Sequence, residues 1–155
     1  MRGFDLRSLR FGADDEAWRR LPVEVDPFVF GGAEYGVRGG AVDLDLSVGR
    51  VGDRYTLSAA FHADLQGPCQ RCLEDADVAL DVRGLQVVAR GESVGGEDDE
   101  AYATGYILDA GRWVRDLIGA SLPEQLLCGP ECRGLCPQCG ANLNATPPGH
   151  THDGG

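Results

Sequence analysis

Six cysteines form two groups in this chain, and their spacing is typical of metal-binding turns. Cys69 and Cys72 make one Cys-x2-Cys pair, and Cys136 and Cys139 make a second within Cys-Pro-Gln-Cys-Gly. Such a turn directs two thiolates at one ion, about 2.3 Å from each sulfur, and the Pro and Gly favour the tight turn. The two pairs therefore predict bound zinc.

Four further candidate ligands flank the second pair: Cys128, Cys132, His150 and His152. In all, six sulfurs and two imidazoles are enough for two four-coordinate zinc sites, and the spacing leaves their grouping and the number of ions open. One alternative is a local site with the donors Cys132, Cys136 and Cys139, whose fourth ligand is Cys128, His150, His152 or a cysteine of the Cys69/Cys72 pair brought over in space. The other is a zinc ribbon that joins Cys69 and Cys72 to Cys136 and Cys139 across about sixty residues, because loop-closure entropy grows only slowly with length.

Either grouping fills all four positions of zinc with protein ligands, which favours a structural metal and a chain that is not an enzyme. Thiol redox chemistry is an alternative, but its cysteine pair usually begins a helix, and these pairs are surrounded by turn residues. A zinc-ribbon adapter in transcription is another alternative. His62 stands alone on an alternating segment, so we expect a surface histidine there.

The charge of the chain bears on its partners. Arg and Lys total 14 against 25 acidic residues, a formal net charge of −11. Phosphate backbones are repelled by such a protein at long range, so a purely electrostatic grip on nucleic acid is disfavoured. The balance favours a basic protein partner, with any RNA contact local.

The N-terminus, Met1-Arg2-Gly3-Phe4-Asp5, carries charges where a signal peptide would be apolar. Elsewhere no run of apolar residues approaches about 18 residues, the length of a membrane-spanning helix. We therefore expect a soluble cytoplasmic protein with no membrane partner. In that reducing compartment cysteine pairs are more often metal ligands than disulfides.

Alternating apolar and polar residues predict strands over 41–48, 55–65 and 78–88, and Gly52-Asp53 predicts a hairpin turn between the first two. Gly67-Pro68 ends the second strand just before Cys69. The first cysteine pair should thus lie at a bend between strands. The first forty residues show no clear period, and we expect an outer strand and a loop there.

Asp109 can cap a helix near 110–122, which Pro123 ends. Residues 90–109 are acidic and glycine-rich, and we expect a loop. The fold class predicted is α+β, a mainly antiparallel sheet or small barrel with one amphipathic helix and a C-terminal zinc-knuckle segment. The domain organisation predicted is a core over 1–123 and a Cys/His zinc-binding tail over 124–155.

The chain resembles the YceD family of bacterial and plastid proteins. The resemblance rests on Cys-Gln-Arg-Cys-Leu at 69–73 and Gly-Leu-Cys-Pro-Gln-Cys-Gly at 134–140, followed by Ala-Asn-Leu-Asn at 141–144. Shorter matches lie at 4–6, 43–46, 108–109 and 122–123. This chain departs from many relatives in having His150-Thr151-His152 where they carry Cys-x-Cys.

The resemblance implies a non-enzymatic factor that supports accumulation of large-subunit ribosomal RNA and assembly of the 50S particle. Its implied partner is a large-subunit ribosomal protein or the pre-50S particle itself. Local contact with ribosomal RNA could involve Arg71 and Arg133.

Overall fold

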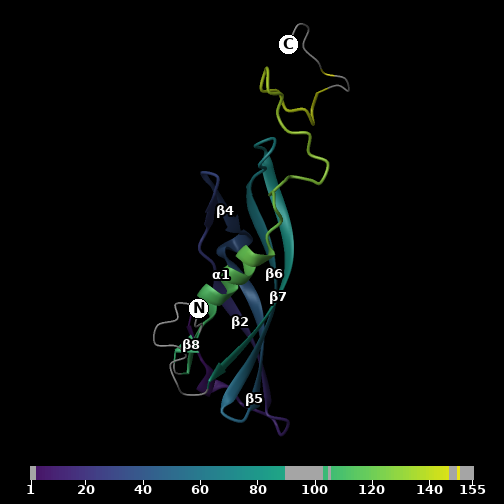
Figure 1. The fold of residues 1–155 in the computed structure, drawn as a ribbon. Coiled ribbons are helices and arrows are strands. Elements are labelled where there is room, and N and C mark those ends of the chain that lie inside the picture. Colours follow the sequence, from purple (N-terminus) through teal and green to yellow (C-terminus); the bar gives the residue numbers. More distant parts are fainter. Residues whose placement is uncertain (1–2, 90–102, 105, 147–149, 151–155) are drawn as a thin grey trace.

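The computed structural model describes residues 3–89, 103–104, 106–146 and 150, and it is dominated by antiparallel sheet (Figure 1). The described strands are β1 (Gly3–Asp5), β2 (Glu16–Glu24), β3 (Phe28–Phe30), β4 (Ala33–Val37), β5 (Ala41–Val51), β6 (Arg54–Pro68), β7 (Asp75–Ala89), β8 (Ala103–Thr104) and β9 (Ile107–Asp109). The helices are the short 3-10 turns η1 (Leu6–Ser8) and η2 (Arg38–Gly40) and the α-helix α1 (Ala110–Ser121).

Strand β6 is the centre of the larger sheet. Its first half pairs with β5, its last residues pair with β4, and its whole length pairs with β7. Strand β2 pairs with β5, and β3 extends the sheet beyond β4. Strands β6 and β7 therefore form one long hairpin, whose tip carries the first cysteine pair.

One face of this sheet forms the hydrophobic core because apolar residues alternate along the strands. On β5 the buried residues are Val42, Leu44, Leu46 and Val48, and on β6 they run from Tyr55 through Leu57 to Leu65. Each fully buried Leu or Val contributes on the order of 1.5–3 kcal/mol. The hairpin predicted from the alternation is confirmed, and its strands are longer than expected.

Helix α1 lies against the inner face of the sheet. The Asp109 Oδ1 accepts a hydrogen bond from the Arg112 backbone N–H at 3.0 Å, which caps the helix as predicted. Trp113, Val114 and Ile118 are fully buried, and Leu117 packs over Gly84 of β7. The helix thus covers the inner face where β7 has no side chain.

The N-terminal forty residues hold more strand than the scattered sequence pattern indicated. Strand β1 pairs with β9, which pairs with β8 in a small separate sheet, and β2 joins the main sheet. The expectation of a loop throughout 90–109 is wrong at its end, where β8 and β9 lie. Residues 90–102 and 105 lie outside the described residues.

The fold class is confirmed as mainly antiparallel sheet with one α-helix in the described ranges. The division into 1–123 and 124–155 stays a prediction. Across the described part of the chain, no helix is both long and apolar enough to cross a membrane.

Tyr35 on β4 fixes the end of β6 that leads into the cysteines. Its hydroxyl donates to the Pro68 carbonyl at 2.6 Å, and its ring lies against Gly67. A Cβ at Gly67 would come within 2.1 Å of that ring. Glycine is therefore required for this contact, which holds the strand in place directly before Cys69.

Candidate metal centre

The first cysteine pair occupies a tight turn between β6 and β7. The Leu73 N–H donates to the Cys69 carbonyl at 3.0 Å, and the Cys69 N–H donates to the Glu74 carbonyl at 2.7 Å. Leu73 adopts a left-handed conformation, with φ of 64°, although it is not glycine. This turn places the thiols of Cys69 and Cys72 on one side of the hairpin tip.

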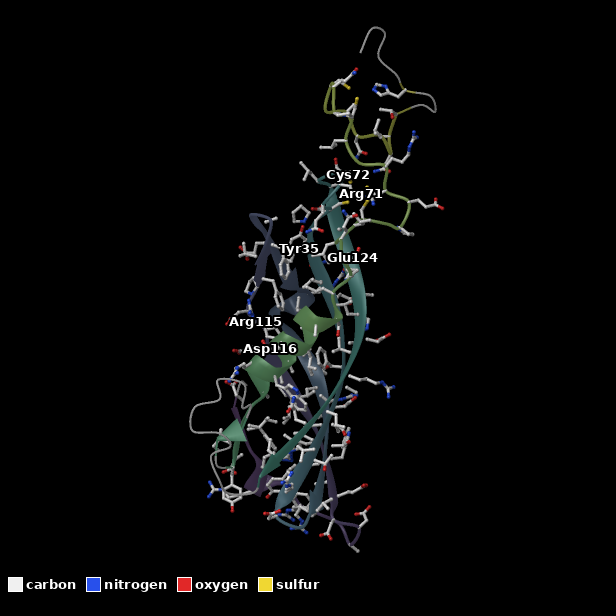
Figure 2. The ribbon with its side chains drawn as sticks, in the orientation of Figure 1. Tyr35, Arg71, Cys72, Arg115, Asp116 and Glu124 are labelled. Carbon is white, nitrogen blue, oxygen red and sulfur yellow. The ribbon has the colours of Figure 1, made fainter. Side chains whose placement is uncertain are left out.

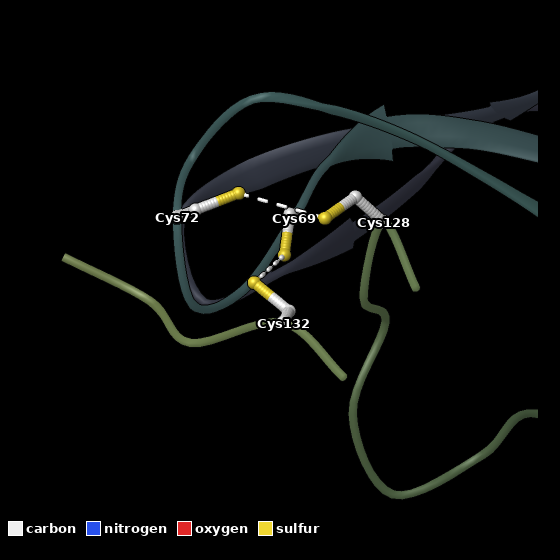
Figure 3. A group of neighbouring side chains, drawn as sticks. All are labelled: Cys69, Cys72, Cys128 and Cys132. Atoms are coloured by element: carbon white, nitrogen blue, oxygen red, sulfur yellow. Dashed lines mark hydrogen bonds between the residues drawn. The ribbon is translucent and has the colours of Figure 1, made fainter. Parts of the chain in front are cut away.

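Two cysteines of the segment after α1 complete the group, as Figure 3 shows. The Sγ atoms of Cys69 and Cys132 are 3.6 Å apart, and those of Cys72 and Cys128 are 3.7 Å apart. All four sulfurs lie within 4.8 Å of one another. Cys69, Cys72 and Cys132 are buried, whereas Cys128 is exposed.

Backbone and side-chain hydrogen bonds hold this segment against the hairpin tip. The Gln70 N–H donates to the Leu126 carbonyl at 2.8 Å, and the Leu126 N–H donates to Gln70 Oε1 at 2.8 Å. The Arg71 guanidinium donates to the Cys132 carbonyl at 3.0 Å. Figure 2 shows Arg71 and Cys72 at this junction. The two halves of the group are therefore aligned by contacts other than the sulfurs.

The surroundings of the sulfurs favour thiolate at two positions. Burial raises the pKa of the Cys69 thiol. Hydrogen bonds from the backbone N–H groups of Cys72, Arg71 and Cys128 outweigh that effect and lower the pKa to about 6. The side-chain N–H of Asn144, 3.4 Å from Cys132 Sγ, lowers the pKa of Cys132. N–H bonds to sulfur of this kind are the outer-shell contacts that stabilise metal-bound thiolates.

The other thiols resist ionisation in the absence of a cation. Hydrogen bonds with Cys72 and Cys132 raise the pKa of Cys128 to about 12. Four neighbouring thiolates repel one another, and a divalent cation among them removes that repulsion and deprotonates the thiols. A divalent cation bound in this group would therefore allow all four thiols to ionise.

The geometry of the four sulfurs fits zinc. A tetrahedral ion with four bonds of about 2.3 Å has sulfurs about 3.8 Å apart. The two Sγ–Sγ separations in the structure, 3.6 and 3.7 Å, agree with that value. A disulfide needs about 2.0 Å between sulfurs, and none of the six cysteines is in a disulfide. Soft thiolate ligands in this arrangement suit zinc among the common divalent ions.

The grouping in the structure differs from both alternatives drawn from spacing. Cys69 and Cys72 do join a distant cysteine pair, but that pair is Cys128 and Cys132. Cys136 and Cys139 instead lie with His150, in a separate group of three. His152 lies outside the described residues. The short spacing between Cys132 and Cys136 predicted that they share one ion. In the structure, the hydrogen bonds of Gln70 and Arg71 with the segment after α1 hold Cys132 at the hairpin tip instead.

Sequence reasoning missed the role of Asn144. Its amide oxygen accepts from the Arg133 N–H at 2.9 Å while its amide nitrogen reaches Cys132. Its own N–H donates to Asn142 Oδ1 at 2.9 Å. The sequence does hold a signal for this role. Asn-Leu-Asn follows the Cys-x2-Cys turn of Cys136 and Cys139, which we call the second knuckle, and asparagine side chains often bond to nearby backbone.

Comparison with known proteins places the chain among relatives. The family model described as large ribosomal RNA subunit accumulation protein YceD matches residues 57–154. This chain belongs to the YceD family. The match begins on β6 and takes in every described cysteine of this family member, including the four at the hairpin tip.

Individual relatives agree with the family. This YceD-family chain is 33% identical over 120 residues to an uncharacterized protein of Mycobacterium tuberculosis, covering 75% of this chain and 58% of that protein. It is 30% identical over 119 residues to one of Mycobacterium leprae, covering 74% and 54%. The chain thus spans a little over half the length of these relatives.

A plant relative carries a functional name. Over 39 residues the chain is 44% identical to large ribosomal RNA subunit accumulation protein YCED homolog 1, chloroplastic, of Zea mays. That match covers 25% of this chain and 13% of the maize protein. No solved structure matches the chain.

The outer face of the sheet of this YceD-family chain carries an exposed apolar strip. Trp18, Ser47, Ser58 and Leu85 lie opposite one another across β2, β5, β6 and β7. Trp18 is 62% and Leu85 63% exposed. The two large side chains thus stand on either side of two serines. We call this row, with its exposed neighbours Val51 and Val87, the outer strip.

Proposed function

We propose that this chain is a non-enzymatic cytoplasmic factor that supports accumulation of large-subunit ribosomal RNA and assembly of the 50S subunit. The observation that carries the proposal is the family match over residues 57–154. The maize relative, whose name states the same role for that protein, supports it.

The four cysteines at the hairpin tip hold zinc in a structural role. Their sulfurs supply all four ligands of a tetrahedral ion, which is the composition of structural rather than catalytic zinc sites. The ion joins the segment after α1 to the β6–β7 hairpin. Its contribution is to make one rigid surface from two parts of the chain that are distant in sequence.

The partner of the outer strip is a basic segment of a large-subunit ribosomal protein. The hollow beside Trp18 is lined by Val51 and small residues, and its charged lining residues, Asp14 and Glu16, are both acidic. The net charge of −11 adds long-range attraction for a basic partner and repels an RNA backbone. Tryptophan is one of the residue types enriched among the contacts that contribute most to protein interfaces.

Depletion of the protein in its native cell tests the ribosomal role. We expect the ratio of large- to small-subunit ribosomal RNA to fall, and the tagged protein to sediment with precursors of the 50S particle. A normal ratio together with free migration of the protein at low and high salt would contradict the role.

The substitutions Trp18→Ser and Leu85→Ser test the outer strip. Because both side chains are exposed, the fold should remain, while loss of a buried interface tryptophan costs about 2 kcal/mol or more, roughly 30-fold in affinity. Co-sedimentation of the purified variants with pre-50S particles is the measurement. Val29→Ser on β3, which removes an equally exposed apolar residue elsewhere, is the matched control.

Metal analysis separates structural zinc from thiol redox chemistry. Protein purified without added metal should contain zinc, and its buried thiols should react slowly with a disulfide reagent until a chelator is added. Metal-free protein whose thiols cycle rapidly between the reduced and disulfide forms would favour the redox alternative.

A further inference from the structure

The second knuckle repeats the backbone geometry of the first. In the first turn the Leu73 N–H donates to the Cys69 carbonyl at 3.0 Å. In the second, the Gly140 N–H donates to the Cys136 carbonyl at 2.9 Å. The same bond thus closes each turn, between the first cysteine and the residue four positions later.

Two further features coincide. The Cys136 N–H donates to the Ala141 carbonyl at 2.8 Å, as the Cys69 N–H does to the residue five positions after it at 2.7 Å. The residue after the second cysteine is left-handed in both turns, with φ of 64° at Leu73 and 74° at Gly140. Two turns with one conformation present their thiols in the same way, and the first lies in a complete set of four sulfurs.

A histidine takes the place of further sulfurs at the second knuckle. The Cys139 Sγ lies 3.7 Å from His150 Nε2, and these atoms lie within 4.8 Å of Cys136 Sγ. A tetrahedral zinc ion with one sulfur at about 2.3 Å and one nitrogen at about 2.05 Å holds them about 3.6 Å apart. The separation fits a shared ion.

We propose that Cys136, Cys139 and His150 bind a second zinc ion, distinct from the one held by the four cysteines at the hairpin tip. The chain then carries two ions of different composition. The fourth position of the second ion takes solvent or a further donor. The proposal does not depend on the ribosomal role, since it concerns only the ligands and their number.

The second site also bears on the first. Leu135 and Asn142 form a β-bridge around the second knuckle, and the Leu143 N–H donates to the Gly134 carbonyl at 2.9 Å. This small hairpin leads directly into Asn144, whose side chain donates to Cys132 Sγ. An ion in the second site therefore orders the segment that supports a ligand of the first.

Native mass spectrometry of the full chain with zinc alone tests the proposal. Wild-type protein should bind two ions, whereas Cys139→Ser and His150→Ala should each bind one. The control is Gln138→Ala, which changes an exposed residue of the same turn that has neither a thiol nor an imidazole. This variant should still bind two ions. Cadmium-113 NMR should show one four-sulfur resonance in every variant and a second, shifted resonance only where two ions bind.

Near-UV circular dichroism of buried Trp113 shows whether each variant retains its core. A single ion in wild-type protein, or two ions in Cys139→Ser, would overturn the second site. With the core intact, loss of both ions from Cys139→Ser would show that the two sites are not distinct. Removal of the first ion by a chelator should be at least several-fold faster in Cys139→Ser than in Gln138→Ala.

Discussion

Leu73 is the residue at which the metal turn is most strained. A leucine in the left-handed region costs about 1–2 kcal/mol, and glycine adopts it freely, as Gly140 does in the second knuckle. The side chain of Leu73 is 66% exposed and so gains little from packing. The strain is therefore a consequence of forming this Cys-x2-Cys turn without glycine at the position after its second cysteine.

The substitution Leu73→Gly should stabilise the protein by up to about 1 kcal/mol, because relief of the strain exceeds glycine's larger entropy in the unfolded chain. Denaturant unfolding of the metal-loaded protein measures this. Leu73→Ala removes the side chain but keeps the strain, so it should show no such gain. An equal gain in both variants would mean that strain is not the cause.

His62 makes stability depend on pH. Its Nδ1 lies 2.9 Å from Asp81 Oδ1 and its Nε2 3.0 Å from Asp64 Oδ1, and hydrogen bonds to Asp81 and then Asp64 raise its pKa. His62, Asp64 and Asp81 line a surface hollow whose other charged lining residues are Arg20, Arg38, Asp43, Asp45 and Arg83. Because the folded pKa exceeds the unfolded value, the stabilisation is present at low pH and is lost as pH rises through the folded pKa.

The variant His62→Gln should therefore melt below wild type at about pH 5 and match it at about pH 8. The zinc-loaded proteins should be compared by thermal unfolding at both pH values. A difference that is the same at both would exclude protonation of His62 as its source.

Among the elements, the β5–β6 hairpin and α1 could be predicted from the sequence, whereas the N-terminal strands and the grouping of the cysteines could not. Alternation over 41–65 specifies a strand with one buried face, and Asp109 with Pro123 marks the helix ends. Trp18 illustrates the reason. In a segment without regular alternation, nothing in the sequence indicates which face of a strand a residue lies on, and this tryptophan is exposed in the structure.

Strand β6 depends on the contact of Gly67 with Tyr35. The variant Gly67→Ala places a methyl group against a buried ring that is held by its bond to Pro68, so we expect a loss of about 1–3 kcal/mol. Denaturant unfolding is the measurement. Gly36→Ala on the adjacent β4 meets no atom within 4 Å and should be nearly neutral. A neutral Gly67→Ala would show that the ring moves freely.

In the whole molecule, the cysteine group at the hairpin tip, which we call the metal group after its proposed role, forms a small apolar cluster separate from the main core. Cys69, Cys72, Ala76 and Cys132 are packed with Leu127 and Leu135, whereas the core between sheet and α1 contains the large aliphatic residues. Figure 1 shows the chain after α1 continuing to the tip of the β6–β7 hairpin. The core should not require the ion.

Chelation of zinc should therefore release the segment after α1 without unfolding the core. Hydrogen exchange should show loss of protection at the amides of Gln70 and Cys136, which donate to carbonyls of that segment. The amide of Leu57, within the β5–β6–β7 pairing, should stay protected. Simultaneous loss of protection at all three amides would mean that core and metal group unfold as one unit.

The pairing of Cys69 with Cys132 across 63 positions of sequence sets an order of events during synthesis. The hairpin leaves the ribosome with two thiols of the site already placed but with no partners for them. Only when Cys132 has emerged can four sulfurs surround one ion. On the proposed assignment of zinc to the hairpin tip, capture of the ion would mark the moment at which α1 and the segment beyond it have been made and have folded back onto the sheet.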